Sequence, residues 1–178
     1  IIEKDINYPI SYEQERVLLA CELNPNTAYN LVKCTHVRGL LDLKSMQEAF
    51  SSLVNMYDML KVSFEFENDT WNQKINSEVV VNVETYEYFG NLDEILEKFV
   101  RIFDFSVAPL MRLGVVKISD EEFVVLSDIH HVIADGISES IILNTLNELY
   151  LHSYTNRESV SYLQYAIEQK NRSFVKEE

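Results

Sequence analysis

Hydrophobic positions along the chain follow two spacings, one of three to four residues and one of two. A stripe at helical spacing predicts a helix that begins after Asp42, and it consists of Met46, Phe50, Leu53, Val54, Tyr57 and Leu60. The segment 61–67 (KVSFEFE) then alternates strictly, with Val62, Phe64 and Phe66 on one face. A helix followed by a half-buried strand is therefore predicted.

The same patterns predict most of the remaining elements. Ser11, with Gln14 three residues later, forms a capping box and predicts a helix over 12–23. Asn91 is placed to cap a helix whose apolar stripe is Leu92, Ile95, Leu96, Phe99, Ile102 and Phe103. Further strands are predicted at 31–37, 71–75 and 79–86, and further helices at 137–150 and 159–172.

Two strands near the middle of the chain define the fold class. Segments 110–118 and 122–129 are apolar on both faces and are joined by a short loop, which predicts a hairpin at the centre of a sheet. The predicted order of elements is α-β-α-β-β-β-α-β-β-α-α. This order favours an α/β class fold, a mixed α+β two-layer sandwich in which helices pack against one mixed sheet.

Composition and charge narrow the classes of function. The chain has 178 residues, 47% of them hydrophobic, which is enough for one domain or one lobe of a larger domain. Its net charge of -14 disfavours binding to nucleic acid or to anionic membranes, because such a surface repels phosphate. No apolar stretch reaches the ~18 residues of a membrane helix, and no signal peptide is visible.

The cysteines indicate the cellular compartment, and the first residue indicates the extent of the chain. Cys21 and Cys34 are too few and too far apart for a disulfide framework, so we expect buried free thiols in a reducing cytoplasm. The chain begins with Ile1 rather than methionine, and we therefore expect it to be a piece of a longer protein.

The segment 128–138 (DIHHVIADGIS) places two histidines side by side. In an extended chain His131 continues the face of Phe123 and Ile129, whereas His130 continues the face of Asp128. The two imidazoles therefore cannot serve one cavity in the same way. The alternation does not say which of the two reaches a site.

Three kinds of chemistry could use this segment, and the residues support them to different degrees. A metal site needs at least three converging ligands, and only His131 and Asp135 have a suitable spacing, so no metal is expected. A serine hydrolase is disfavoured because G-x-S-x-G is absent and Ser138 is placed to cap the following helix. Acyl transfer fits better, since a neutral imidazole can accept a proton from an attacking amine or hydroxyl group. Asp135 would then orient the loop, Gly136 would keep the approach open, and a purely structural role for the motif remains an alternative.

The motif IHHVIADG resembles the HHxxxDG signature of condensation domains in nonribosomal peptide synthetases. Other segments resemble motifs of the same family in the same order, namely SYEQERVLLA (11–20), TAYNL (27–31), MYDMLKVSF (56–64), FDFSVAPLMR (103–112) and YLQYAIEQ (162–169). The resemblance covers nearly the whole chain. It is more specific than any single motif.

The resemblance implies a fold similar to chloramphenicol acetyltransferase. A complete domain of this family has two such lobes with the active site in a tunnel between them. Residues 1–178 would form the N-terminal lobe, and the C-terminal lobe would be absent from this chain. We therefore expect the isolated lobe to be inactive, because half of the tunnel wall is missing.

The resemblance also implies a role for each motif residue. His131 would meet the acceptor amine, either as a base or as a positioning group, and His130 would be structural. Asp135 would pair with the residue at the family's arginine position, which is Lys61 here and lacks the bidentate fork of arginine. Gly136 would line the tunnel. We also expect Ser138 to contact the substrate, and Arg16 to be buried and paired.

The implied reaction is amide-bond formation between an acyl thioester on a donor carrier domain and the amine of an aminoacyl thioester on an acceptor carrier domain. The lobe itself would bind no cofactor, because the carrier domains supply the 4'-phosphopantetheine arms. Its partners would be those carriers, the C-terminal lobe and an adenylation domain of the same assembly line. Epimerisation, ester formation and a non-catalytic carrier-docking module are the alternatives.

Overall fold

A computed structural model describes residues 2–152 of the chain. The elements follow in the order β1 (Asn7–Pro9), α1 (Tyr12–Leu23), β2 (Asn30–Arg38), α2 (Leu43–Met56), the 3-10 helix η1 (Asp58–Lys61), β3 (Val62–Glu67), β4 (Thr70–Ile75), β5 (Glu84–Glu87), α3 (Leu92–Phe99), β6 (Met111–Ser119), β7 (Glu122–His130) and α4 (Gly136–Tyr150). The helix predicted at 159–172 and the motif at 162–169 lie outside the described residues.

The described strands form two sheets, not the single mixed sheet that the sequence predicts. The smaller sheet is antiparallel in the order β1-β4-β3, and the larger has the order β2-β7-β6-β5 with β5 parallel to β6. Strand β1 was not predicted. It is only three residues long and ends at Pro9, a residue that an edge strand tolerates because proline cannot donate to a sheet.

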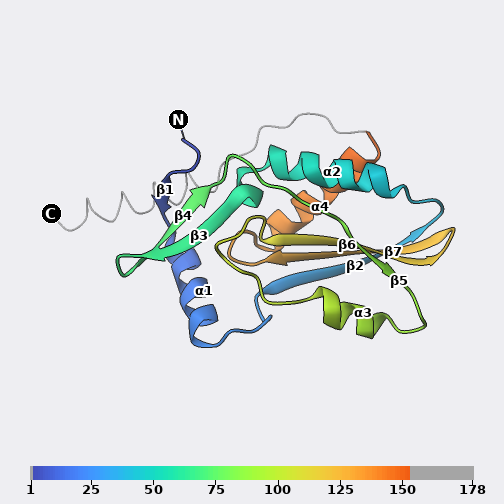
Figure 1. Cartoon of the computed structure of the whole chain (residues 1–178), viewed down its shortest axis with the longest axis horizontal. Helices are drawn as coiled ribbons and strands as arrows, with labels where there is room; N and C mark the ends of the chain where they lie inside the picture. Colours follow the sequence, from blue (N-terminus) through green and yellow to red (C-terminus); the bar gives the residue numbers. More distant parts are fainter. Residues whose placement is uncertain (1, 153–178) are drawn as a thin grey trace.

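Helices cover both faces of the larger sheet (Figure 1). Helices α2 and α4 lie over one face and α3 over the other. On the α3 side, Ile95 and Phe99 pack against Val116, Val124 and Leu126 of the two central strands. The hairpin of β6 and β7 is therefore central, as its doubly apolar pattern predicts, and the mixed α/β class is confirmed.

Side-chain caps begin α1, α2 and α3 at the predicted residues. The Gln14 backbone N–H donates to Ser11 Oγ at 3.1 Å, and the Ser11 backbone N–H donates to Gln14 Oε1 at 2.9 Å. This reciprocal pair confirms the capping box, and caps of this kind stabilise a helix by about 1 kcal/mol. Asp42 and Asn91 cap α2 and α3 in the same way, each accepting a backbone N–H two residues later.

Three predicted elements are shorter than expected. Helix α2 ends at Met56, so the last two residues of its predicted stripe, Tyr57 and Leu60, lie outside it. The strand predicted at 79–86 begins only at Glu84, because the Gln47 side chain bonds the backbone of Val81 and Val83 in place of a neighbouring strand. Helix α3 ends at Phe99 although its apolar stripe continues. The Arg112 guanidinium donates to the carbonyls of residues 101 and 102, which fixes this segment outside the helix.

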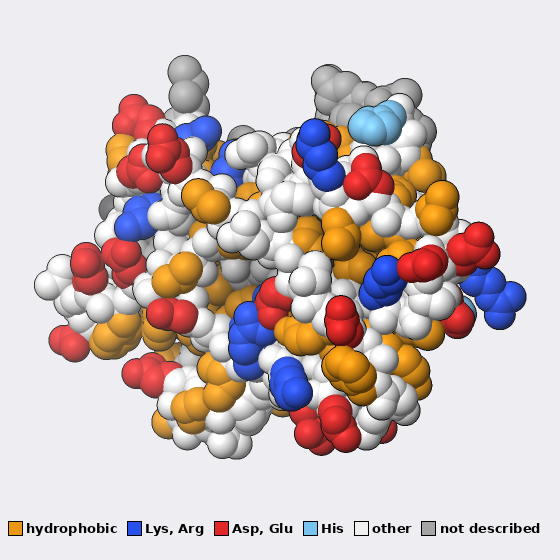
Figure 2. Space-filling view, turned by 45° about the vertical axis from the view of Figure 1, so that its right-hand side comes forward, with side chains coloured by type: hydrophobic (Ala, Val, Ile, Leu, Met, Phe, Trp, Pro, Cys, Tyr) orange, Lys and Arg blue, Asp and Glu red, His pale blue; other side chains and the backbone are white. Residues whose placement is uncertain are grey.

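The surface carries the acidic charge that the composition implies. Acidic side chains are spread over the face shown in Figure 2, with hydrophobic side chains between them. Cys21 is partly buried, but Cys34 is exposed, which corrects the expectation of two buried thiols. Cys34 lies in the middle of β2, an edge strand of the larger sheet whose central residues are exposed. None of the described helices is long and apolar enough to cross a membrane.

Candidate functional site

The double histidine lies where β7 ends and a turn begins. Strand β7 ends at His130, one residue earlier than the extended segment assumed for the sequence. The His131 backbone N–H still donates to the Tyr29 carbonyl at 2.8 Å, and the Ile133 N–H turns back to the His130 carbonyl at 3.1 Å. The backbone of both histidines is thus fixed by hydrogen bonds.

His130 is enclosed in the interior, with 2% of its surface exposed. Its Nδ1 accepts the Val132 backbone N–H at 3.1 Å, so the ring proton lies on Nε2, 3.8 Å from Cys21 Sγ. The rings of Phe103 and Phe105 meet the imidazole edge to face, with centroids 5.8 and 4.9 Å away. These contacts fix both the tautomer and the orientation of His130.

The charge state of His130 follows from this burial. Desolvation, together with the nearby His131 and Arg112, lowers the pKa of His130 to about 4. His130 is therefore neutral near pH 7. An imidazole in this state contributes packing and hydrogen bonds rather than charge.

His131 is exposed and lies in the wall of a cavity of about 330 Å³. Helix α1 and the segment from His131 to the start of α4 line this cavity, with Glu13, Gln14, Arg16, Val17, His131, Val132, Ile133, Ala134, Asp135 and Ser138. Four residues predicted from the sequence, Arg16, His131, Asp135 and Ser138, therefore come together. His130, Lys61 and Gly136 are not among its lining residues.

A buried pair of glutamines joins the elements around this cavity. Gln14 and Gln73 exchange amide hydrogen bonds of 3.2 Å, and Gln14 Nε2 also lies 3.5 Å from the Val132 carbonyl. Gln73 Nε2 donates in addition to the Pro9 carbonyl at 2.9 Å. Sequence reasoning missed Gln73. Gln73 lies in the middle of a predicted strand between polar neighbours, so its burial could not be predicted from the sequence.

Asp135, not Ser138, caps helix α4. Asp135 Oδ1 accepts the Ser138 backbone N–H at 2.7 Å, which corrects the expectation that Ser138 would be the cap. This hydrogen bond from Ser138 also lowers the pKa of the Asp135 carboxyl group. The Asp135 carboxylate thus holds the turn between His131 and α4.

The ion pair expected between Asp135 and Lys61 is not formed within residues 2–152. Lys61 is 5% exposed, and its ammonium group lies 2.8 Å from Asp58 Oδ1 and donates to the Asn55 carbonyl at 3.1 Å. Asn55 belongs to the last turn of α2, where unpaired carbonyls attract a cation. The single point charge of lysine is satisfied there.

Arg16 also departs from expectation. Its side chain is exposed, so the predicted burial is wrong, and no hydrogen bond or ion pair joins it to another residue of the described range. It lies on α1 at the wall of the cavity that contains His131. Arg16 therefore brings a positive charge to a cavity whose other charged lining residues, apart from His131, are the carboxylates Glu13 and Asp135.

A buried ion pair supports the far side of His130. Arg112 Nη1 lies 2.7 Å from Asp128 Oδ2, and the Arg112 guanidinium stacks 3.6 Å from the centroid of Phe103. Burial raises the pKa of Asp128 and lowers that of Arg112, because both charges are desolvated. The pairing was missed although Arg112 and Asp128 are opposite each other in the predicted hairpin. A register shift between Lys117 and Ser119 separates this pair from the turn, so the pairing does not follow from a simple count along the hairpin.

No group of three or more potential metal ligands gathers anywhere in residues 2–152. The ionisable groups that line the cavity are an imidazole, a guanidinium and two carboxylates. Among these groups only an imidazole readily exchanges a proton near neutral pH.

Comparisons with known sequences point to one family. A family model described as Condensation domain matches residues 4–177. Surfactin synthase subunit 1 of Bacillus subtilis (strain 168) is 34% identical over 173 residues, which are 96% of this chain and 5% of that protein. Tyrocidine synthase 2 of Brevibacillus parabrevis is 36% identical over 171 residues, which are 94% of this chain and 5% of that protein. The chain thus spans a small fraction of these relatives.

Solved structures share the fold. The starter condensation domain of rhizomide synthetase superimposes with a TM-score of 0.79 at 18% identity, over 96% of this chain and 45% of that one. A four domain nonribosomal peptide synthetase bound to AMP and glycine superimposes with a TM-score of 0.81 at 23% identity, over 95% of this chain and 14% of that one. Together with the family model, these matches show that the chain belongs to the condensation-domain family of nonribosomal peptide synthetases and has its chloramphenicol acetyltransferase-like fold.

Proposed function

We propose that this chain is the N-terminal, HHxxxDG-bearing lobe of a condensation domain that forms an amide bond between two carrier-bound substrates. The observation that carries the proposal is the position of His131. It lies exposed in the wall of a cavity of about 330 Å³, directly after a buried and neutral His130. One imidazole is thus available to a substrate while its neighbour is fixed in the core.

The reaction needs one proton acceptor and no nucleophile from the protein. The amine of the acceptor attacks the thioester carbonyl of the donor, and a C–N bond forms as the C–S bond breaks. His131 orients the amine or accepts the proton that it loses, and the departing thiolate finally takes up a proton. General base catalysis of this kind accelerates such a step by about 10²–10⁴-fold.

Neighbouring residues support His131 in this role. The Tyr29 carbonyl holds its backbone, and the Tyr29 ring meets the imidazole edge to face at 6.3 Å. Asp135 fixes the turn on the other side by capping α4. His131 is therefore held between two anchored segments, which limits the entropy lost when a substrate is oriented.

The proposal includes the partners of the lobe. Donor and acceptor carrier domains would supply the two thioesters on their 4'-phosphopantetheine arms, and an adenylation domain would load them. A C-terminal lobe would complete the tunnel. The match to 45% of a solved condensation domain supports this division into lobes. We infer that residues 1–178 alone do not catalyse condensation, and turnover by this chain alone would contradict the inference.

The test is replacement of His131 by alanine in a complete condensation domain that contains this lobe. We expect single-turnover amide formation to fall by about 10²-fold or more, while binding of the loaded carriers changes little. The matched control is His36→Ala, because His36 is exposed on β2 and pairs with Glu122 at 2.7 Å. Turnover of His131→Ala at the rate of the His36→Ala control would rule out the assignment.

A further inference from the structure

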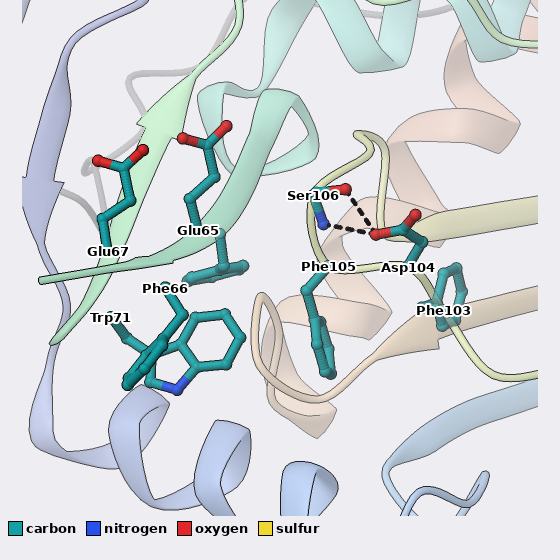
Figure 3. Close-up of a pocket in the computed structure, with 9 residues that line it drawn as sticks. Glu65, Phe66, Glu67, Trp71, Phe103, Asp104, Phe105 and Ser106 are labelled. Atoms are coloured by element: carbon teal, nitrogen blue, oxygen red, sulfur yellow. Dashed lines mark hydrogen bonds between the residues drawn. The ribbon is translucent and has the colours of Figure 1, made fainter. Parts of the chain in front are cut away.

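His130 also lies in the wall of a second hollow. Two adjoining cavities of about 520 and about 390 Å³ share the side chains of Phe66, Trp71, Phe103 and Phe105. We call them together the aromatic groove. Figure 3 shows the first cavity, with Phe66 and Trp71 of the β3–β4 hairpin on one side and the loop from Phe103 to Ser106 on the other. None of these residues takes part in the proposed acyl transfer.

The walls of the aromatic groove form a chain of ring contacts that leads from the surface to the core. Phe66 is 51% exposed, and its ring centroid lies 5.4 Å from that of Trp71. The Trp71 ring meets the Phe105 ring edge to face, with the centroids 6.3 Å apart. Phe105 in turn meets the buried His130 at 4.9 Å. A large aromatic side chain exposed on such a stack presents the kind of surface that binds other rings and apolar groups.

One polar atom in the groove lacks a partner. Trp71 Nε1 is buried and donates to no other atom of residues 2–152. Because this N–H is enclosed by the protein, an acceptor reaches it only when the indole ring moves, and such a movement would relieve an unfavourable unpaired donor.

Carboxylates surround the aromatic surface. Glu22, Glu67 and Asp104 are exposed lining residues, and Glu65 is already paired with Lys74 at 2.8 Å. Neither cavity has a lysine or arginine among its lining residues. The groove therefore favours a ligand that is positively charged at its ends and apolar between them.

We propose that the aromatic groove binds a short peptide segment of a partner protein, with an aromatic or branched apolar side chain flanked by lysine or arginine. The apolar side chain would contact Phe66 and Phe105, and the basic side chains would pair with the carboxylates. A second copy of the chain is a poor occupant, because two molecules of net charge -14 repel each other.

Trp71 provides the measurement, because it is the single tryptophan of the chain. We would titrate the 178-residue chain with the tryptophan-free peptide acetyl-Lys-Phe-Leu-Arg-amide and record tryptophan fluorescence. A saturable change is expected. The peptides acetyl-Glu-Phe-Leu-Glu-amide and acetyl-Lys-Ser-Ser-Arg-amide should bind at least about tenfold more weakly, since each lacks one of the two recognised features.

Variants of the chain then locate the site. Phe66→Ser should raise the Kd for the basic peptide by about tenfold, whereas Phe89→Ser, at an 88% exposed phenylalanine outside the groove, should leave it unchanged. The double variant Glu22→Gln with Glu67→Gln changes only exposed side chains. It should weaken binding and reduce the dependence of the Kd on salt.

Four outcomes would overturn the proposal. These are the absence of a saturable signal, equal binding of the acidic peptide, an equal effect of Phe66→Ser and Phe89→Ser, and binding of phenethylamine as tight as that of the peptide. The last result would identify a small-amine site instead of a peptide site. The test uses no condensation assay, so its result is independent of whether His131 is catalytic.

Discussion

Arg112 and Asp128 face each other across the two central strands, with Arg112 Nη1 2.7 Å from Asp128 Oδ2. Asp128 is fully buried, and Asn30 Nδ2 donates to the same oxygen at 2.9 Å. The guanidinium also donates to the carbonyls of residues 101 and 102 and covers the ring of Phe103. This pair therefore joins the central hairpin to the loop that encloses His130.

Removing one partner of this pair should be costly. Arg112→Met leaves the Asp128 carboxylate buried without its cation and frees two carbonyls, so we expect the free energy of unfolding to fall by about 3–5 kcal/mol. Urea denaturation of the chain measures this. The double variant Arg112→Met with Asp128→Leu removes both charges and should recover part of the loss. A single variant within 1 kcal/mol of wild type would show that the pair contributes little.

Burial of neutral His130 predicts how stability depends on pH. The folded-state pKa of His130 is about 4, compared with 6.5 for an unperturbed histidine. Between these two values the unfolded chain binds the proton and the folded chain does not, so stability falls as the pH is lowered from 6.5 to 4. The stabilisation gained by keeping His130 neutral in the folded state is complete above pH 6.5. It amounts to about 3 kcal/mol, because a difference of one pKa unit corresponds to about 1.36 kcal/mol.

The variant His130→Asn isolates this effect, because asparagine does not titrate and its carbonyl can accept the Val132 N–H. Urea denaturation over this pH range should give a flatter profile for His130→Asn than for the wild type. Carboxyl groups that titrate in the same pH range are present in both proteins. Their effect on stability therefore cancels when one profile is subtracted from the other. Parallel profiles would mean that His130 does not resist protonation in the folded state.

The close contact at Gly114 predicts a second stability effect. A Cβ atom at Gly114 would lie 3.0 Å from Cε2 and 3.2 Å from Cδ2 of Phe99, the last residue of α3, whose side chain is fully buried. Gly114→Ala should therefore cost about 1–3 kcal/mol through overpacking. The double variant Gly114→Ala with Phe99→Leu should show a smaller effect of the alanine. Equal effects of the alanine in both backgrounds would exclude Phe99 as the cause.

Local patterns predict the elements well because each depends on residues close in sequence. The capping box of Ser11 and Gln14 defines the start of α1 correctly, and the doubly apolar hairpin gives two central strands. Separation into two sheets was not predictable in this way. It depends on which strands pair in space: β3 and β4 pair with each other and with β1, and none of the three pairs with a strand of the larger sheet.

Partners of long charged side chains were predicted less well. Lys61 pairs with Asp58 instead of Asp135, and Arg16 is exposed instead of paired. A flexible charged side chain has several possible partners within reach, and their energies differ by less than sequence spacing can resolve. Arg112 and Asp128 are direct neighbours across the two strands, but a register shift between Lys117 and Ser119 means that a count from the turn would not have paired them.

Substitution of Gly136 should affect folding and the proposed reaction differently. A Cβ atom at Gly136 meets nothing within 4 Å, and the residue is the first of α4, so alanine fits without strain. Gly136→Ala should leave the free energy of unfolding unchanged or raise it by up to about 1 kcal/mol, since alanine is the better helix former.

Activity should respond in the opposite direction. If Gly136 lines the tunnel in a complete condensation domain, the added methyl group displaces the substrate from His131. The kcat/KM for amide formation should then fall by at least about tenfold, because small displacements of the reacting atoms are costly. Denaturation and turnover measured on the same preparation test both expectations. Unchanged stability with unchanged turnover would place Gly136 outside the substrate path, and lost stability would contradict the open space seen around it.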